Sequence, residues 1–416
     1  MHHVTTEPPM AHSLKIGLIL NEPPIAEKSA AARSYEATTR VIARELENKA
    51  GSTDNIEFPA FWMNSSDINA DEKLCQAKFP SLASRFHLFD IHTPRRFFEK
   101  INNRLQPMAF HASPAMRAAI KKALDSQLVD LLHLEHAWMV YALPRSFNPD
   151  RVLLSLHFLL STDFTAAPPA RSFREIVTRQ RLIRAELRLI RRCTHFRVLS
   201  DDMAETLKKL HPSAKIHVVP LAIDASAYEF RPRPATHNLQ APVLSVIGSM
   251  NWPPTQSAAN RMLTLLWPSI YKAMPHARLQ VVGRQARQFF GEYHGRDNIE
   301  IHENVPRIEP YFHGSSLLVY APSAGSGMKV KVQEAMLMGL PVITNRSGIE
   351  GLNADHDRHC LIAETDSEFI SQTINLLNNP SLAQTISTKA RALVESQCDP
   401  QMIYHKTLDI YQNMAR

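Results

Sequence analysis

The sequence predicts an α/β protein of two Rossmann-like domains that face a central cleft. Short apolar runs alternate with amphipathic segments in both halves of the chain, which favours parallel sheets covered by helices on both faces. The alternation is interrupted once, by turn-forming residues around the RPRP run at 231–234, and then restarts. At 416 residues the chain exceeds the usual size of one domain, so two are expected.

The elements of the first half follow from local patterns. LKIGLIL (14–20) is short, apolar and unbroken, as expected of a buried strand, and a helix is predicted after it over 34–49. Segment 51–115 mixes polar and aromatic residues without a clear period. The other elements expected here are helices over 115–127, 172–192 and 202–210, and strands at 129–136, 151–157, 195–200 and 215–221.

The second half repeats the pattern. Strands are predicted at 243–248, 278–283, 298–305, 316–321 and 341–344, and helices over 257–274, 366–378, 381–395 and 400–414. The chain therefore divides into a disordered tail (1–13), a first domain (14–222), a linker (223–242), a second domain (243–398) and a C-terminal helix (399–416) that packs back on the first domain. Ligands in open α/β sheets bind beyond the carboxyl ends of the strands, so we expect the site between the domains.

The composition is that of a folded protein with a modest basic excess. Forty-seven basic and 40 acidic residues give a net charge of +7 and a pI near 9.2, which favours anionic ligands or a membrane surface. The cysteines are far apart and form no CxxC pair, so we expect free thiols in a reducing cytoplasm: Cys75, Cys193, Cys360 and Cys398. Neither a signal peptide nor a membrane-spanning run is visible, and a cytoplasmic protein is expected.

A glycine loop lies between the predicted strand at 316–321 and a helix. Its residues are Gly325, Ser326 and Gly327. Val330 stands where a dinucleotide fingerprint needs its third glycine, and no Walker pattern is present. Backbone N–H groups of such a loop, together with the helix N-terminus, can face an anion. The alternative is a simple tight turn in a βαβ unit.

Two lysines and a glutamate follow the loop. Lys329 and Lys331 at a helix start oppose the helix dipole, which suggests a bound anion as their partner, and a diphosphate fits. The alternative is two solvated lysines. Glu334 lies three residues beyond Lys331 and can accept hydrogen bonds from sugar hydroxyls. Its alternative role is a helix ion pair with Lys331.

Four blocks of the second half now indicate a family. VLSVIGSMNWPP (243–254), ARLQVVGR (277–284), the 316–344 block and GIEGL (348–352) resemble, in order and spacing, the nucleotide-binding domain of family-4 retaining glycosyltransferases. The resemblance implies the two-domain GT-B architecture, with a nucleotide-sugar-binding second domain and an acceptor-side first domain. The first half resembles the family more weakly, through LKIGLIL, VDLLHLEHAWM, VLLSLH, FRVLSDD and HVVPLAID.

The resemblance implies roles for the donor-side residues. Glu334 matches the second glutamate of the family's Glu-x7-Glu motif, which contacts the donor's ribose, while Ser326 stands in place of the first. Lys331 matches a basic residue that holds the diphosphate. A second basic residue is expected near the first strand of this domain, but 249–255 contains no Lys or Arg, and Lys329 is expected to compensate. Further donor contacts are expected from Gly248, Ser249, Arg284, Gly325, Ser326 and Gly327.

The first domain offers three candidates at strand ends. His157 matches a family histidine that hydrogen bonds the transferred sugar without a metal, and a structural histidine is the alternative. Glu135 and His136 are predicted to contact the acceptor. With His133 they suggest a metal cluster, but strand alternation puts 136 on the opposite face from 133 and 135. The loop at 21–36 contains no glycine, unlike the usual family loop.

A basic segment at 171–197 carries nine arginines and two glutamates. Ile176, Ile183, Leu187 and Ile190 form one predicted apolar stripe. The segment is expected to be either a solvated face over a core or a surface for anionic lipid headgroups, which would suit a lipid-linked acceptor. No nucleic-acid motif accompanies the charge, so no nucleic-acid partner is expected.

The resemblance implies a retaining, metal-independent hexosyltransferase. It moves a sugar from a nucleotide-diphosphate sugar to an acceptor hydroxyl of a cell-surface polysaccharide, glycolipid or similar glycoconjugate. His157, Lys331 and Glu334 are the expected catalytic residues, and no cofactor is expected. The enzyme would be cytoplasmic, with peripheral contact at the inner face of the membrane. Two alternatives remain open: a GT-B-type nucleotide-sugar epimerase and a non-catalytic sugar-nucleotide-binding subunit.

Overall fold

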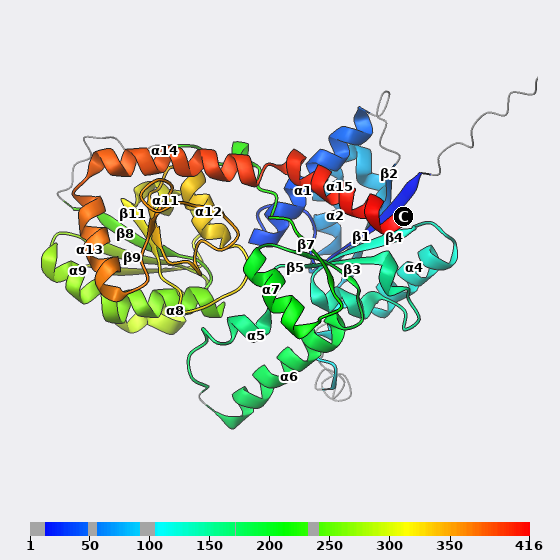
Figure 1. Ribbon diagram of the computed structural model, residues 1–416, viewed down its shortest axis with the longest axis horizontal. Coiled ribbons are helices and arrows are strands. Elements are labelled where there is room, and N and C mark those ends of the chain that lie inside the picture. The colour runs from blue at the N-terminus through cyan, green and yellow to red at the C-terminus, as the bar shows by residue number, and fades with distance from the viewer. Residues whose placement is uncertain (1–12, 49–55, 92–104, 171, 232–240) are drawn as a thin grey trace, which may run out of the picture.

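Two parallel sheets, each covered by helices, make up the two lobes in Figure 1. The computed structural model describes residues 13–48, 56–91, 105–170, 172–231 and 241–416. The predicted fold class, two Rossmann-like α/β domains, is confirmed. The predicted tail lies outside the described residues apart from Ser13, as does the 232–240 part of the linker.

The N-terminal sheet has seven strands in the order β3-β2-β1-β4-β5-β6-β7. Its central strands are buried on both faces, which explains their nearly continuous apolar sequences. The strands are β1 (Leu14–Leu20), β2 (Ile56–Ser65), β3 (Phe86–Asp90), β4 (Leu131–Glu135), β5 (Val152–Leu156), β6 (His195–Val198) and β7 (Lys215–Val218).

The helices of this domain begin at a serine or aspartate N-cap, except the short α5, which follows Leu159. They are α1 (Ala30–Glu47), α2 (Ile68–Lys78), α4 (Pro114–Asp125), α5 (Leu160–Asp163), α6 (Phe173–Ile190) and α7 (Asp201–Leu210). The start of α1 corrects the predicted start at residue 34: the Ser29 hydroxyl accepts a hydrogen bond from the Ala32 amide and caps the helix one turn earlier. The segment without a clear period forms β2, α2 and β3 in its described part.

The C-terminal sheet has six strands in the order β10-β9-β8-β11-β12-β13. They are β8 (Val243–Ile247), β9 (Arg278–Gly283), β10 (Ile299–Glu303), β11 (Leu317–Tyr320), β12 (Val342–Thr344) and the unpredicted two-residue β13 (Leu361–Ile362). Its helices are α8 (Pro253–Arg261), α9 (Trp267–Ala273), α10 (Ala286–Phe290), α11 (Glu309–Gly314), α12 (Val330–Leu337), α13 (Asp366–Leu377) and α14 (Pro380–Gln397).

The helix predicted over 257–274 is divided in two. A π-helical turn at Met262–Leu266 separates α8 from α9. Pro268 lies in the first turn of α9 and has no amide hydrogen, so the α-helical hydrogen-bond ladder cannot continue through it. The wider turn lets the chain remain helical across this point.

The last helix, α15 (Pro400–Ala415), returns to the N-terminal domain. Figure 1 shows it lying along α1, above the N-terminal sheet, while α14 covers the other lobe. Tyr404 and Tyr411 are buried in the N-terminal core. The two chain crossings between the domains touch, because the Ile223 amide donates to the Cys398 carbonyl at 2.9 Å.

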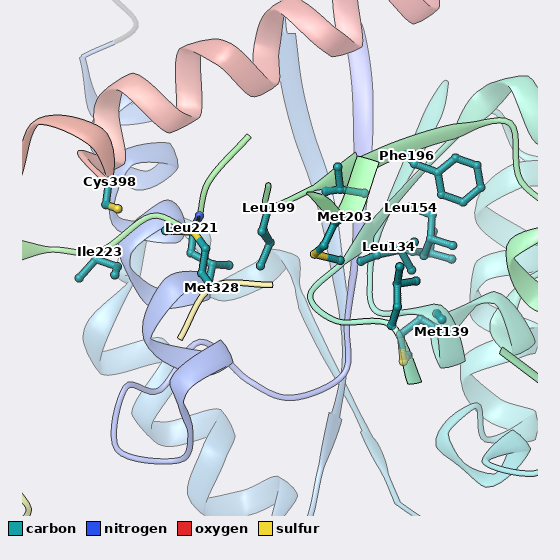
Figure 2. Packing of buried hydrophobic residues seen from close by; sticks show 14 of the residues in the cluster. Leu134, Met139, Leu154, Phe196, Leu199, Met203, Leu221, Ile223, Met328 and Cys398 are labelled. Atoms are coloured by element: carbon teal, nitrogen blue, oxygen red, sulfur yellow. Dashed lines mark hydrogen bonds between the residues drawn. The ribbon is translucent and has the colours of Figure 1, made fainter. Parts of the chain in front are cut away.

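A shared apolar contact joins the two domains. Met328, from the C-terminal domain, lies beside Leu221 and Ile223 at the crossing, within the buried cluster of Figure 2. The Leu221 amide lies 3.2 Å from the Met328 sulfur. All four cysteines are buried free thiols, as the sequence indicates.

Candidate functional site

The domains meet where the parallel strands of both sheets end. The hydroxyl of Ser326, after β11, donates to Asp163 at 2.7 Å, and the Arg284 guanidinium, after β9, donates to the Lys28 carbonyl at 3.1 Å. Ser200, after β6, donates to Glu350, after β12, at 2.5 Å. These contacts place the loops at the carboxyl ends of the two sheets against each other, as expected of ligand sites in such sheets.

The glycine loop needs its glycines. Gly327 has a φ of +72° in the left-handed region, and a Cβ there would lie 2.1 Å from the carbonyl oxygen of His157. A side chain would therefore push the loop away from the end of β5. The backbone of His157 and the glycine loop are direct neighbours across the domain boundary.

Two carboxylates accept hydrogen bonds from the backbone amides of this loop. The Ser326 amide donates to Asp163 Oδ1 at 2.8 Å, and the Gly327 amide donates to Glu350 Oε1 at 3.0 Å. Successive amides of this kind form an anion-binding concavity. The anion expected from the sequence was a diphosphate, and the groups that fill the position here are protein carboxylates from each domain.

The side chain of Lys329 is buried against the glycine loop. Lys329 is the N-cap of α12, and its side chain is 1% exposed. Its ammonium donates to the Gly327 carbonyl and lies 3.2 Å from Glu350 Oε2. Burial lowers the pKa of Lys329, while the nearby Glu350 opposes the shift. Lys329 therefore stabilises the glycine loop through the Gly327 carbonyl and through Glu350.

Lys331 and Glu334 form a pair on α12. The Lys331 ammonium lies 2.6 Å from Glu334 Oε2, and the Arg33 guanidinium forms an ion pair with Glu334 Oε1 at 2.8 Å across the domain boundary. Tyr228 donates its hydroxyl hydrogen to the same carboxylate at 3.2 Å. Burial alone would raise the pKa of Glu334, but Lys331 and Arg33 outweigh it and hold that pKa below its usual value. Glu334 is thus an ionised acceptor.

A small cavity of about 80 Å³ adjoins this pair. It lies between α1 and the crossing segment, and its lining includes Arg33, Tyr228 and Val330. Its lining therefore comes from both domains, whereas the pair and the glycine loop belong to the C-terminal domain alone.

His157 is held by a carboxylate. Its Nε2 lies 2.7 Å from Glu135 Oε2, and Glu135 Oε1 lies 3.4 Å from both Arg197 and His133. Burial would raise the pKa of Glu135, but His133, the hydrogen bond from His157 and Arg197 hold it far below its usual value. His136 sits apart with a φ of +134°, and its ring accepts a hydrogen bond from the Trp138 amide at 3.3 Å.

Burial also lowers the pKa values of the neighbouring histidines. The pKa falls to about 4 for His133 and to about 3 for His136, so both rings are neutral at neutral pH. Within the described ranges, no group of three His, Cys, Asp or Glu side chains is arranged to hold a metal ion.

The loops that follow β8 and β9 pack tightly against each other. Gly248 is buried, and a Cβ on Gly283 would lie 1.7 Å from the Gly248 carbonyl oxygen. The Ser249 hydroxyl donates to the Asn251 side chain at 2.6 Å. The Met250 amide donates to the Arg284 carbonyl at 3.0 Å, so the two loops are also joined through their backbones.

The basic helix α6 buries less than its stripe predicts. Of the predicted apolar stripe, Ile190 is buried but Ile176 is 48% exposed, so the stripe is buried only toward its C-terminal end. The buried face consists of Ala185, Glu186, Leu189 and Ile190. In Figure 1 the first half of α6 projects from the bottom of the N-terminal lobe.

Two family models match the chain, one in each domain. Residues 79–227 match the model described as Glycosyltransferase Family 4, and residues 241–379 match Glycosyl transferases group 1. Together these ranges cover more than half of the chain and follow its two sheets. The chain belongs to the family-4-type glycosyltransferases.

Solved structures agree with this glycosyltransferase in fold. HepE from Anabaena, solved with UDP-glucose, is 13% identical with a TM-score of 0.59 over 96% of this chain and 100% of its own. Sucrose-phosphate synthase from Thermosynechococcus elongatus is 14% identical with a TM-score of 0.67 over 97% and 99%. S. aureus TarM is 10% identical with a TM-score of 0.62 over 96% and 99%. A search of curated proteins finds no match.

In this glycosyltransferase the structure adds residues that the motifs did not reveal. Arg33 and Tyr228 contact Glu334, while Asp163 and Glu350 contact the glycine loop. The sequence contains a weak signal for Glu350, which lies inside the GIEGL block, and for Arg33, which lies in the segment 21–36 that lacks the usual family glycine. Nothing local marks Asp163. No helix among the described residues is long and apolar enough to cross a bilayer.

Proposed function

We propose that this glycosyltransferase moves a hexosyl unit from a nucleotide-diphosphate sugar to an acceptor hydroxyl, with retention of anomeric configuration. The observation that carries the proposal is the Lys331–Glu334 pair, placed directly after the glycine loop and at the domain boundary. A cation and an ionised acceptor three residues apart suit a diphosphate and the adjoining ribose. Expected roles are Lys331 for the diphosphate, Glu334 for the ribose hydroxyls and His157 for the transferred sugar.

The departing diphosphate sets the main chemical demand. Negative charge develops on it as the glycosidic bond breaks, and preorganised cations and amides lower the energy of that state. Lys331 supplies the cation, and the amides of Ser326 and Gly327 supply dipoles once Asp163 and Glu350 release them. Lys329 adds charge behind the loop. Closure of the domains excludes water, which otherwise competes as acceptor.

We further propose that the reaction needs no metal ion. The charge of a diphosphate is matched by Lys331, Lys329 and Arg33, which all lie at the loop or on the facing helix. Turnover is expected to be unchanged after treatment with EDTA. Loss of turnover that added Mg²⁺ or Mn²⁺ restores would overturn this part of the proposal.

Support for the donor and acceptor classes comes from the structural neighbours. HepE was solved with UDP-glucose, and TarM was solved with Fondaparinux, α-GlcNAc-glycerol and UDP. These ligands belong to those proteins. They support a nucleotide sugar as donor and a glycan as acceptor here. We propose that the acceptor is a glycan or lipid-linked glycan in the synthesis of a polysaccharide or glycolipid.

A cytoplasmic location with peripheral membrane contact completes the proposal. The exposed end of α6 combines Phe173, 80% exposed, with Ile176 and Arg174. Arginines attract anionic headgroups, and apolar side chains insert between them. Such contact would bring the N-terminal domain to a lipid-linked acceptor.

A non-catalytic sugar-nucleotide-binding subunit is the second candidate. Two observations favour it: the Ser326 and Gly327 amides already donate to Asp163 and Glu350, and Ser326 stands where the family has a glutamate. A donor screen by calorimetry with uridine, guanosine and adenosine diphosphate sugars, followed by turnover assays with candidate acceptors, separates the two.

The outcomes of this screen are distinct. Donor binding with transfer, and an anomeric coupling constant in the product that matches the donor, supports the retaining transferase. Tight binding without transfer or hydrolysis supports the binding subunit. Conversion of the donor sugar to its epimer without an acceptor identifies an epimerase. A protein that binds none of the three donors contradicts all of these functions.

A further inference from the structure

A continuous chain of buried polar groups runs from the C-terminal helix to the domain boundary. The Tyr411 hydroxyl of α15 lies 2.6 Å from Nδ1 of His133, and Nε2 of His133 lies 2.7 Å from the Ser155 hydroxyl. Nε2 of His133 also lies 3.4 Å from Glu135, which contacts His157. A buried polar network of this kind is stable when each of its groups has a hydrogen-bond partner within the network.

Glu135 is the charged centre of this network. It is buried at the carboxyl end of β4, and the Arg197 guanidinium lies 3.4 Å from its Oε1. Arg197 is itself fixed, because it donates to the Val219 and Pro220 carbonyls at 3.3 and 2.5 Å. A buried carboxylate needs such a partner, and the pairing keeps Glu135 ionised. An ionised carboxylate only accepts hydrogen bonds.

That charge state determines the tautomer of His157. Since Glu135 only accepts, the Nε2 atom of His157, 2.7 Å away, carries a hydrogen. In a neutral imidazole the other nitrogen, Nδ1, then bears a lone pair. No described residue forms a hydrogen bond to Nδ1, whereas the His157 backbone touches the glycine loop. A free acceptor atom is therefore held where the two domains meet.

We propose that Glu135 is a positioning residue that fixes His157 as the Nε2–H tautomer, so that Nδ1 accepts a hydrogen bond from a hydroxyl of the transferred sugar. Both carboxylate oxygens of Glu135 face protein partners, which suits this role better than the direct acceptor contact expected from the sequence. The inference rests on the proposed function for the identity of the hydroxyl. The tautomer itself does not depend on it.

Glu135→Gln tests the inference with almost no change of shape. Its amide has one acceptor oxygen and one NH₂ donor, whereas Arg197 and His157 both present N–H groups to residue 135. The charged Arg197 guanidinium takes the amide oxygen, so the NH₂ group faces Nε2 of His157, and the hydrogen of His157 moves to Nδ1. Glu135→Asp is the conservative variant, since it keeps the charge and the acceptor-only character.

Tyr411→Phe is the matched control. It removes the α15 end of the same network but leaves Glu135 and His157 in place. Any variant that acts only by loosening the N-terminal core should resemble it. Thermal midpoints of all variants are measured first, so that kinetic effects are compared between proteins of similar stability.

The first measurement is ¹⁵N NMR of the histidine ring nitrogens in the full-length protein, with His157→Gln for assignment. We expect the Nε2–H pattern for His157 in the unmodified protein, in Glu135→Asp and in Tyr411→Phe, and a shift toward Nδ1–H in Glu135→Gln. An unchanged tautomer in Glu135→Gln would overturn the inference. Because this measurement needs no substrate, it stands even if no transferase activity is found.

The second measurement is steady-state kinetics with the donor identified by the screen. We expect kcat to fall roughly tenfold to a hundredfold in Glu135→Gln, the equivalent of one hydrogen bond involving a charged group, with little change in the KM for the donor. Glu135→Asp should recover part of the loss. An equal loss in Tyr411→Phe would assign Glu135 a purely structural role and overturn the positioning one.

Discussion

Lys331 is the residue whose replacement tests the donor site most directly. Its ammonium contacts Glu334, which also keeps Arg33 and Tyr228 as partners, so Lys331→Ala should leave the fold intact. We expect the affinity for the nucleotide sugar to fall about tenfold or more, because one charge-assisted contact to the diphosphate is lost. Calorimetric titration of the donor measures it.

Lys389→Ala is the control for this variant. Lys389 is an exposed lysine on α14 of the same domain, and its removal changes net charge equally. Equal donor affinities for the two variants and the unmodified protein would rule out a diphosphate role for Lys331.

Glu186 gives a prediction about pH. Its side chain is buried in α6 and accepts a hydrogen bond from the Leu160 amide at 2.9 Å. Burial, with a smaller contribution from Asp163, raises the pKa of Glu186 to about 8. The folded protein therefore holds a proton that the unfolded chain releases near pH 4 to 5, and this group lowers stability as pH rises from there to about 8.

Glu186→Gln should remove that dependence. The amide is neutral at every pH and its oxygen still accepts from Leu160, so the variant should gain stability over the unmodified protein as pH rises, by about 1 kcal/mol or more at pH 8. Denaturant unfolding at pH 5.5 and pH 8 measures it. The same difference in stability at both pH values would show that Glu186 is ionised throughout.

Contacts between single residues of the site could be predicted only where a local sequence pattern determines them. Lys331 and Glu334 are three residues apart on one helix, and their contact follows from helix geometry. The Arg33–Glu334 and Asp163–Ser326 contacts join positions far apart in sequence. No periodicity links such pairs, so their partnership emerges only when the two domains are packed together.

Among the elements, α6 tests the membrane proposal. Arg174 and Arg184 are exposed on this helix, and each basic residue near an anionic bilayer contributes about 1 kcal/mol of binding. Charge reversal at both, Arg174→Glu with Arg184→Glu, should abolish flotation with vesicles that contain anionic lipid. Binding of the unmodified protein should weaken as salt rises.

A matched pair on another helix controls for net charge. Arg117→Glu with Lys122→Glu places the same reversal on exposed positions of α4. If this pair weakens flotation as much as the α6 pair does, the helix has no special role. An unmodified protein that does not float at low salt identifies α6 as a solvated face.

Strands and helices were predicted well where one rule dominated. The last three helices have clear amphipathic patterns and start at capping residues, and the structure places α13, α14 and α15 within a few residues of the predictions. The β2–α2–β3 region was missed because Ile56–Ser65 carries aromatic and polar residues together in a strand buried by its neighbours. This strand is determined by its burial among neighbouring elements and not by a local sequence period.

At the scale of the whole molecule, Asp163 joins the domains. Its carboxylate accepts from the Ser326 amide and hydroxyl, and from the Trp252 indole at 2.9 Å. Asp163→Asn places an NH₂ group against one of these donors, at a cost of about 1–3 kcal/mol. We expect a lower thermal midpoint and a larger radius of gyration in solution scattering, because the closed arrangement loses its central contact.

Asp409→Asn is the control for this effect. Asp409 is exposed on α15, away from the domain boundary, and the substitution changes charge in the same way. A radius of gyration unchanged in Asp163→Asn relative to this control would show that other contacts, such as Ser200–Glu350, suffice to hold the domains.

The two-domain architecture was readable because each half repeats the strand–helix alternation around its own sheet. The way the halves close on each other was not, since it depends on contacts such as the hydrogen bonds that the Ser326 and Gly327 amides donate to Asp163 and Glu350. Local sequence patterns describe each sheet and its helices. They carry no information about how two separately folded domains are oriented relative to each other.

The return of α15 has a mechanical consequence. Because the chain crosses between the lobes twice, and the crossings are bonded at Ile223 and Cys398, the lobes are joined by a two-stranded strap. One tether permits swinging and twisting in all directions, whereas two adjacent tethers favour rotation about one axis, the line across the strap. Opening should therefore be a hinge rotation of one lobe about that single axis, and the lobes should return to the same closed position after each cycle.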